Sequence, residues 1–101
     1  RTRLQQRAQA ALQSLQTYLA PYAKWQEPTG GFYIWLKLDP RIKIDALFDA
    51  ARAQGVLINP GDLYAFQHVQ AIRLSYAYAE PAAFAAGCRI LKQLIETQLT
   101  H

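Results

Sequence analysis

Two short segments with a period of two place the strongest constraint on the fold. Residues 32–38 read FYIWLKL and residues 72–77 read IRLSYA, and both are rich in the aromatic and β-branched residues typical of strands. Successive side chains of a strand point to opposite faces, so each segment presents one apolar face. These faces consist of Phe32, Ile34, Leu36 and Leu38, and of Ile72, Leu74 and Tyr76. We expect the two strands to pair antiparallel, with helices packed against their apolar faces.

The opposite face of this predicted sheet differs from an ordinary surface exposed to solvent. It combines the rings of Tyr33 and Trp35 with the polar side chains of Lys37, Arg73 and Ser75. Exposed aromatic patches mark places where another molecule or domain binds. We therefore interpret this face as one half of an interface.

Three amphipathic helices are predicted around the sheet. The first has apolar residues at steps of three and four from Leu4 to Leu19 and ends before Pro21. The second spans residues 46–54, with Asp45 as its cap and Gly55 after its end, and a short strand at 56–58 follows. The third begins at Pro81, and its apolar stripe comprises Phe84, Cys88, Leu91, Ile95 and Leu99. The order α-β-α-β-β-α predicts an α+β fold with a small sheet of about three strands and helices on one face.

The composition is that of a single folded domain. The 101 residues leave room for one core across 1–101, and 51% of them are hydrophobic while 18% are charged. The chain starts at Arg1 and contains no methionine, so we expect it to be a piece of a longer protein. Its apolar stretches are far shorter than the roughly 20 residues that span a bilayer, and no signal peptide is recognised, so we expect a cytoplasmic location without membrane contact.

Few residues are candidates for metal binding or nucleophilic chemistry. His68 and His101 have no second ligand at the spacing of a metal site, so no metal is expected. Cys88 is the single cysteine and lies on the apolar stripe of the last helix, as a buried structural thiol does. The net charge of +4 is scattered along the chain, which is weak support for nucleic-acid binding.

Three motifs in a fixed order make the chain similar to a known family. They are PTGGFYIWL at residues 28–36, GVLINPG at 55–61 and IRLSYA at 72–77, the last one followed by the closing helix. With these motifs the sequence resembles the C-terminal small domain of fold-type I aminotransferases, which use pyridoxal 5'-phosphate (PLP). The resemblance covers nearly the whole chain and implies the fold of that domain.

The resemblance implies one residue that binds substrate. In the family the arginine of the third motif binds the α-carboxylate of the amino acid, and the matching position here is Arg73. A planar guanidinium offers a carboxylate two parallel donors, which a lysine cannot do. Phe32 and Tyr33 match positions beside the substrate pocket, and packing is the alternative role for both rings.

The catalytic parts of such a protein are expected outside this chain. The family's chemistry needs a lysine that holds the cofactor, an acidic partner for the pyridine nitrogen and a phosphate-binding loop, all of them on the large domain. The chain's own lysines do not match the context of that lysine; they are Lys24, Lys37, Lys43 and Lys92. We therefore expect no catalytic residue here, PLP in the full-length parent, and no PLP bound by this chain alone.

Two kinds of full-length parent are compatible with the resemblance. The one we favour is a MocR-type transcriptional regulator, in which a GntR-like DNA-binding domain precedes an aminotransferase-like domain that senses the cofactor and an amino acid or amine. The other is a free-standing class I/II amino-acid aminotransferase. The WQEP sequence at 25–28 and the short loop between residues 61 and 72 look like those of the regulators. The parent is expected to be a homodimer that contacts DNA only through its separate N-terminal domain.

A module of a different class would bind RNA or another protein. The aromatic strand near residues 31–35 and the positive net charge are compatible with bases stacked on a sheet. The predicted strand order differs from that of the common RNA-recognition fold, however, and Tyr33 stands where the signature of that fold has a small residue. We therefore favour the aminotransferase-like interpretation.

Overall fold

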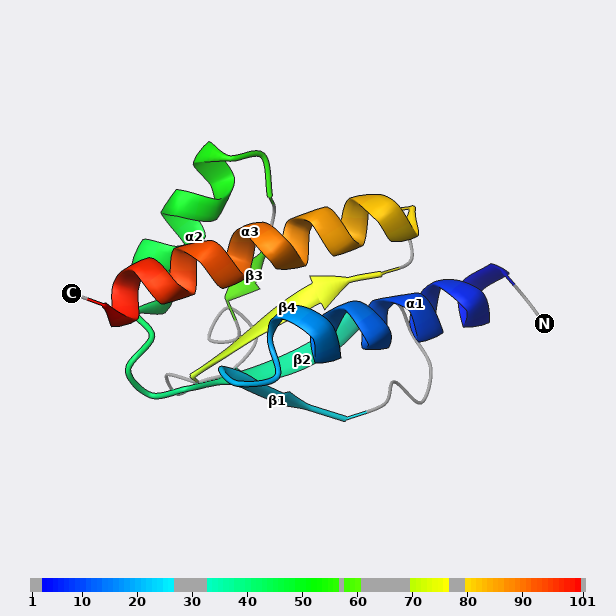
Figure 1. The fold of residues 1–101 in the computed structure, drawn as a ribbon, viewed down its shortest axis with the longest axis horizontal. Helices are drawn as coiled ribbons and strands as arrows, with labels where there is room; N and C mark the ends of the chain where they lie inside the picture. The colour runs from blue at the N-terminus through cyan, green and yellow to red at the C-terminus, as the bar shows by residue number, and fades with distance from the viewer. Residues whose placement is uncertain (1–2, 27–32, 57, 61–69, 77–79, 101) are drawn as a thin grey trace.

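The fold is an α+β arrangement, as predicted (Figure 1). The computed structural model describes residues 3–26, 33–56, 58–60, 70–76 and 80–100. Along the chain follow α1 (Arg3–Tyr18), β1 (Ala23–Trp25), β2 (Tyr33–Leu38), α2 (Ile44–Ala53), β3 (Asn59–Pro60), β4 (Ala71–Ser75) and α3 (Pro81–Leu99). The sheet has the strand order β1-β2-β4-β3, and every neighbouring pair is antiparallel.

The two long strands pair with each other, and the antiparallel direction is the one that we favoured. Tyr33 of β2 lies opposite Ser75 of β4, Trp35 lies opposite Arg73, and the pairing is antiparallel. The side chains between these positions are buried in the core; they are Ile34, Leu36, Leu38, Ile72 and Leu74. Trp35 is 47% exposed and is the large hydrophobic side chain most open to solvent among the described residues. The sheet therefore has a covered apolar face and an open mixed face.

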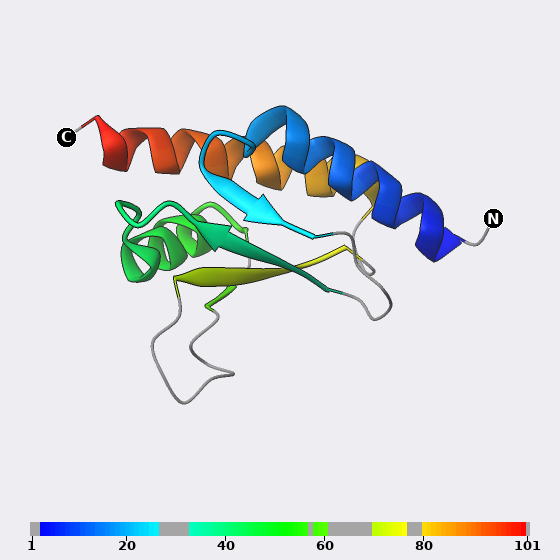
Figure 2. The same cartoon turned by 90° about the horizontal axis from the view of Figure 1, so that it is seen from below.

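Helices α1 and α3 cover the apolar face of the sheet. They lie side by side and run in the same direction, with the strands beneath them (Figures 1 and 2). The predicted stripes face inward: Leu15 and Leu19 of the first, and Phe84, Cys88, Leu91 and Ile95 of the second, are buried. The remaining stripe residues Leu4, Ala8, Leu12 and Leu99 are partly buried against the core, and Ala11 of α1 is buried in addition. Helix α2 packs against α3 and β3 and buries Leu47 and Ala51. Among the described residues no helix is both long and apolar enough to cross a membrane.

The predicted cap of α2 is wrong. The helix begins at Ile44, its N-cap residue is Lys43, and Asp45 lies inside the first turn. This N-cap has no side-chain cap hydrogen bond; the amide of Gln98 from α3 instead holds the backbone of Lys43, because its Oε1 accepts a hydrogen bond from Lys43 N at 2.8 Å and its Nε2 donates to Lys43 O. Asp45 still favours the helix electrostatically, since an acidic side chain near the N-terminus opposes the helix dipole.

The strands at the sheet edges differ most from the prediction. Strand β1 was not predicted, and the strand expected at 56–58 is replaced by β3 at the next two residues. Pro60 fits an edge strand because such a strand needs only one set of hydrogen bonds. Strand β4 ends at Ser75, so Tyr76 is buried outside the strand, and the expected strand residue Ala77 lies outside the described residues, as do Phe32 and the turn at 27–31.

Polar contacts at the periphery join the helices to the sheet. Tyr22, just before β1, donates its hydroxyl to Glu96 Oε2 of α3 at 2.6 Å, and Lys92 pairs with the same carboxylate. Gln70 donates from Nε2 to the carbonyls of Asp39 and Ile42, which ties the chain before β4 to the loop after β2. These contacts fix the ends of the strands that carry the open face.

Candidate carboxylate-binding site

Arg73 lies in the middle of β4, a central strand of the sheet. Its Cα is paired with that of Trp35 on one side and with that of Asn59 on the other, so strands flank its backbone on both sides. Its chain neighbours Ile72 and Leu74 point into the core and are almost fully buried. The base of the side chain is therefore rigid, as a side chain that must aim at a ligand requires.

The guanidinium of Arg73 packs on the ring of Tyr33. The carbon Cζ of the guanidinium is 3.7 Å from the centroid of the ring, which is close contact. Contacts of this kind attract through the ring quadrupole as well as through dispersion. Tyr33 is not directly opposite Arg73 but diagonal to it, at the distance that an aromatic side chain can bridge. Both residues are half-buried.

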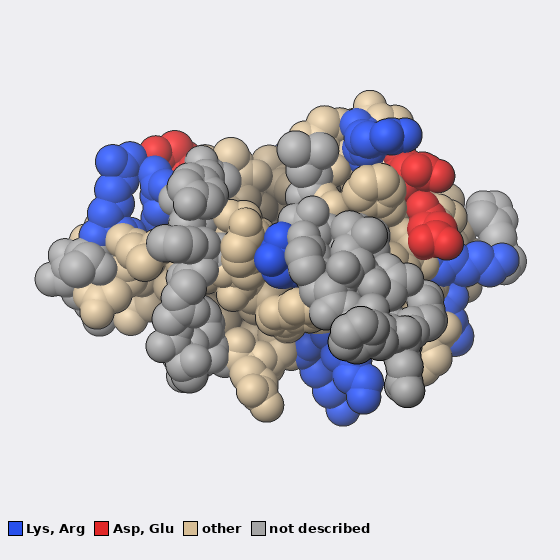
Figure 3. Space-filling model, turned by 180° about the vertical axis from the view of Figure 1, so that it is seen from behind, with Lys and Arg blue, Asp and Glu red and all other residues tan. Residues whose placement is uncertain are grey.

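The open face is basic in the part of the chain that the structure describes. Lys24 of β1 lies opposite Lys37 of β2, and both are exposed on the same face as Arg73. Two like charges directly opposite each other repel, so an anion near this face would lower the repulsion. The view from behind shows basic side chains on this side, while the acidic ones visible there lie at its periphery (Figure 3). The face is thus suited to a negatively charged group.

Ser75 adds a polar group two residues beyond Arg73 on the same strand face. Its Oγ is buried and has no hydrogen-bond partner among the residues that the structure describes. A buried hydroxyl without a partner costs free energy, so it marks a place where a partner would be gained on binding. The alternation of β4 already predicted that Ser75 and Arg73 share a face.

The other predicted site residues divide into two groups. Phe32, His68 and His101 lie outside the described residues, so the place of Phe32 beside a substrate pocket and the absence of a metal site at the two histidines stay predictions. Cys88 is buried, and its burial raises the pKa of the thiol to about 12, as expected of an unreactive side chain. Among the described residues no group of His, Cys, Asp and Glu side chains is placed to hold a metal ion.

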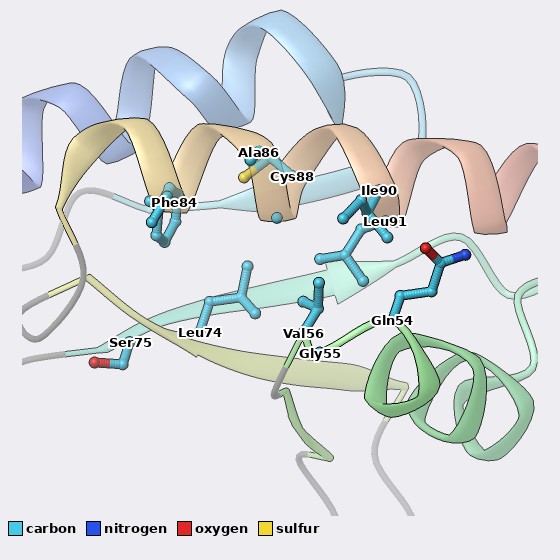
Figure 4. A pocket seen from close by; sticks show the side chains of 12 residues that line it. Gln54, Gly55, Val56, Leu74, Ser75, Phe84, Ala86, Cys88, Ile90 and Leu91 are labelled. Atoms are coloured by element: carbon cyan, nitrogen blue, oxygen red, sulfur yellow. The ribbon is translucent and has the colours of Figure 1, made fainter.

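A hollow that the sequence did not reveal lies on the helix side of the sheet. It has a volume of about 470 Å³ and lies between α3, Gly55 with Val56, and β4 (Figure 4). Its described lining includes Leu74, Phe84 and Leu91 and contains no charged side chain. It therefore does not suit a carboxylate. No periodic signal marks it, because its walls come from three separate segments.

The described lysines do not fit the lysine that holds PLP in aminotransferases. Lys24, Lys37 and Lys43 are exposed, and Lys92 Nζ lies 3.3 Å from the carboxylate of Glu96 on the outside of α3. A lysine that forms a Schiff base has to be desolvated beside its cofactor. These residues can thus supply a group that binds an anion, and the expectation that the lysine holding PLP lies outside this chain stays a prediction.

Comparison with known sequences shows regulators among the relatives of the chain. It is 44% identical over 79 residues to the uncharacterized HTH-type transcriptional regulator YdfD of Bacillus subtilis, which covers 78% of this chain and 16% of the relative. The regulator YisV of the same organism is 35% identical over 89 residues, covering 88% of this chain and 18% of the relative. No protein-family model matches the chain.

Comparison with solved structures shows aminotransferases. The α-aminoadipate aminotransferase LysN of Thermus thermophilus is 26% identical, with a TM-score of 0.85 over 96% of this chain and 25% of the other. The valine-pyruvate aminotransferase AvtA of Salmonella typhimurium is 27% identical, with a TM-score of 0.84 over 97% of this chain and 27% of the other.

The chain matches the C-terminal aminotransferase-like domain of MocR-type regulators. The regulator sequences and the aminotransferase folds agree on this, and they confirm the resemblance found in the motifs. The MocR-type domain spans less than a fifth of the length of the regulators YdfD and YisV. Its open sheet face, with Arg73 on the central strand, is the candidate site.

Proposed function

We propose that, in the full-length protein, this domain binds the α-carboxylate of an amino-acid ligand through Arg73. The full-length protein is then a cytoplasmic regulator whose PLP-dependent, aminotransferase-like part senses the ligand. The observation that carries the proposal is the position of Arg73, which stands on a central strand, packed on Tyr33, on a basic face. The relatives support this setting, since a regulator matches 78% of this chain and the structure of an aminotransferase matches 96% of it.

Binding at Arg73 follows from the chemistry of the guanidinium. Its nitrogen donors form a planar fork that matches the two oxygens of a carboxylate, with N···O distances of about 2.7–2.9 Å in charge-assisted hydrogen bonds. The rigid strand holds the base of the fork, and the exposed Lys37 and Lys24 add positive potential around it. The domain thereby anchors and orients the carboxylate end of the ligand.

The remaining functions are assigned to other parts of the protein. PLP supplies the chemistry at the amino group of the ligand by acting as an electron sink, and in aminotransferases a lysine of the large domain holds it. We therefore assign the cofactor to the large domain and DNA binding to a separate N-terminal domain of a homodimer. That the isolated chain does not bind PLP stays a prediction.

A free-standing aminotransferase is the second candidate. The aromatic-amino-acid aminotransferase 1 of Thermococcus litoralis is 27% identical over 92% of this chain, which supports it. The higher identity to the regulators favours sensing over turnover. Formation of a keto acid from an amino acid by the full-length protein would identify an enzyme.

The test is a titration of the PLP-loaded full-length protein with each of the common amino acids, followed by the absorbance of the cofactor. Arg73→Ala should weaken the response to the preferred amino acid on the order of 30-fold or more, because the carboxylate of the ligand loses its charged hydrogen-bond partner. Arg89→Ala is the matched control, since Arg89 is exposed on α3. If Arg73→Ala responds like the wild type, or if the wild type responds to no amino acid, the proposal is wrong.

A further inference from the structure

Tyr33 and Arg73 form a pair whose geometry follows from the sheet register. Tyr33 lies directly opposite Ser75, whose side chain is small, and Arg73 lies directly opposite Trp35. With nothing bulky opposite it, the ring of Tyr33 reaches the diagonal neighbour, and the guanidinium carbon of Arg73 lies 3.7 Å from its centroid.

We propose that Tyr33 is a positioning residue that holds Arg73 ready for a carboxylate and so helps the protein to select amino acids over amines that lack one. The inference rests on the function proposed for Arg73. An arginine side chain has many rotamers, and a ligand that has to order it loses affinity for that reason. The contact with Tyr33 orders the guanidinium before the ligand arrives.

The ring of Tyr33 contacts the centre of the guanidinium, and Nε of Arg73 is buried, so a carboxylate would bind at the terminal nitrogens of the group. The ring lies against the central carbon of the guanidinium, whereas the N–H groups radiate outward in the plane of the group. A carboxylate binds along that outer edge and therefore does not compete with the ring. An aromatic ring is also weaker than a carboxylate as a partner for arginine, so it orients the side chain without neutralising the charge.

If Tyr33 has this role, the loss of affinity on removing its ring depends on whether the ligand carries an α-carboxylate. Tyr33 acts only through Arg73, so removing its ring should weaken ligands that use Arg73 and should leave the others unchanged. An amine that lacks the α-carboxylate is such an unaffected ligand. A role of Tyr33 in general packing would lower the affinity for both ligands alike, and this separates the two explanations.

The role also predicts which part of Tyr33 matters. The contact is made by the ring, so Tyr33→Phe should bind amino acids like the wild type. Tyr33→Val keeps a residue suited to a strand but lacks the ring. It should weaken the preferred amino acid about fivefold, which is the effect of one exposed cation–π contact.

The experiment uses the PLP-loaded full-length protein with two probes. One is the common amino acid that gives the strongest response in the wild type, and the other is the amine left after loss of its α-carboxylate. Dissociation constants are measured for the wild type, Tyr33→Phe, Tyr33→Val, Arg73→Ala and the double variant Tyr33→Val with Arg73→Ala. The expected result is a loss for the amino acid alone in Tyr33→Val, recovery in Tyr33→Phe and no further loss in the double variant.

The outcomes distinguish the two proposals. If Arg73→Ala loses amino-acid affinity while Tyr33→Val does not, the role of Tyr33 is refuted and that of Arg73 stands. Equal losses for the amino acid and the amine in Tyr33→Val, or a further loss in the double variant, also refute it. If Arg73→Ala binds the amino acid normally, both proposals fail. Should Tyr33→Val unfold, a loss in Tyr33→Phe would still contradict the ring contact.

Discussion

The same substitution at two glycines should change stability in opposite directions. Gly55 follows α2 with a φ of 79°, and its N–H donates to the carbonyl of Arg52. An L-residue in this left-handed region is strained by roughly 1–2 kcal/mol. A Cβ on Gly55 would meet no atom within 4 Å, so the strain is not offset by new packing. Gly55→Ala should therefore lower the free energy of unfolding by about 1 kcal/mol or more.

Gly87 lies inside α3, where a residue with a side chain stabilises the helix more than glycine does. Glycine is about 1 kcal/mol less favourable than alanine in the interior of a helix. A Cβ on Gly87 would lie 3.7 Å from Cγ1 of Val56, which is an ordinary van der Waals contact. Gly87→Ala should therefore raise the free energy of unfolding by up to about 1 kcal/mol.

Urea denaturation followed by far-ultraviolet circular dichroism measures both effects. The two variants should differ by about 2 kcal/mol, and each 1 kcal/mol shifts the melting temperature of a domain of this size by about 4–8 °C. Gly55→Asn is a control, because asparagine tolerates the left-handed region better and should cost less than alanine. A shift of both alanine variants in the same direction would refute either the left-handed conformation of Gly55 or the helical conformation of Gly87.

Three further predictions concern the core, a polar contact and the thiol. Leu36→Ala should lower the free energy of unfolding by about 2–5 kcal/mol because this side chain is fully buried, whereas Trp35→Ala on the opposite face of β2 should change it by less than about 1 kcal/mol in urea denaturation. Hydrogen bonds from Tyr22 and Lys92 hold the pKa of the Glu96 carboxyl below its usual range, so their stabilisation is present above the ordinary pKa of glutamate and is lost as pH falls through the lowered value. Tyr22→Phe should therefore raise the pKa of Glu96 measured by NMR and reduce the loss of stability on acidification. Burial raises the pKa of Cys88 to about 12, so the native thiol should react with a disulfide reagent at mildly alkaline pH far more slowly than the urea-unfolded thiol.

Each of these expectations has a clear contrary result. Equal costs at Leu36 and Trp35 would mean that the two faces of β2 are misassigned. An unchanged pKa of Glu96 in Tyr22→Phe would contradict the contact between the two side chains. Rapid labelling of Cys88 in the native state would show that the thiol is reached by solvent through the neighbouring hollow.

The sequence predicted those parts of the fold in which a periodic pattern of apolar residues is long enough to be recognised. The alternation in β2 and β4 indicated their faces, because a shift by one residue would bury Lys37 and Arg73, whereas the direction of their pairing came only with the structure. Strand β1 escaped prediction since three residues carry no period. The prediction of Asp45 as the cap of α2 was wrong because the helix begins at Ile44, one residue before Asp45, and the contact of Lys43 with Gln98, 55 residues away along the chain, has no local signal in the sequence.

The candidate site was predictable in its position but not in its contacts. Alternation places Arg73, Tyr33 and Ser75 on one face of the sheet. The packing of Tyr33 on Arg73 depends on the register itself, which places the small Ser75 opposite the ring. The resemblance to aminotransferases supplied the carboxylate as the ligand, and no property of the isolated strands could have named it.

The binding role of Arg73 would be seen directly in a crystal structure of the full-length protein with PLP and its preferred amino acid. We expect both oxygens of the α-carboxylate to lie about 2.7–2.9 Å from guanidinium nitrogens of Arg73. The ring of Tyr33 should still lie against the guanidinium carbon, as it does in the domain alone. A carboxylate held by other residues, with the open sheet face buried against another domain, would contradict this role.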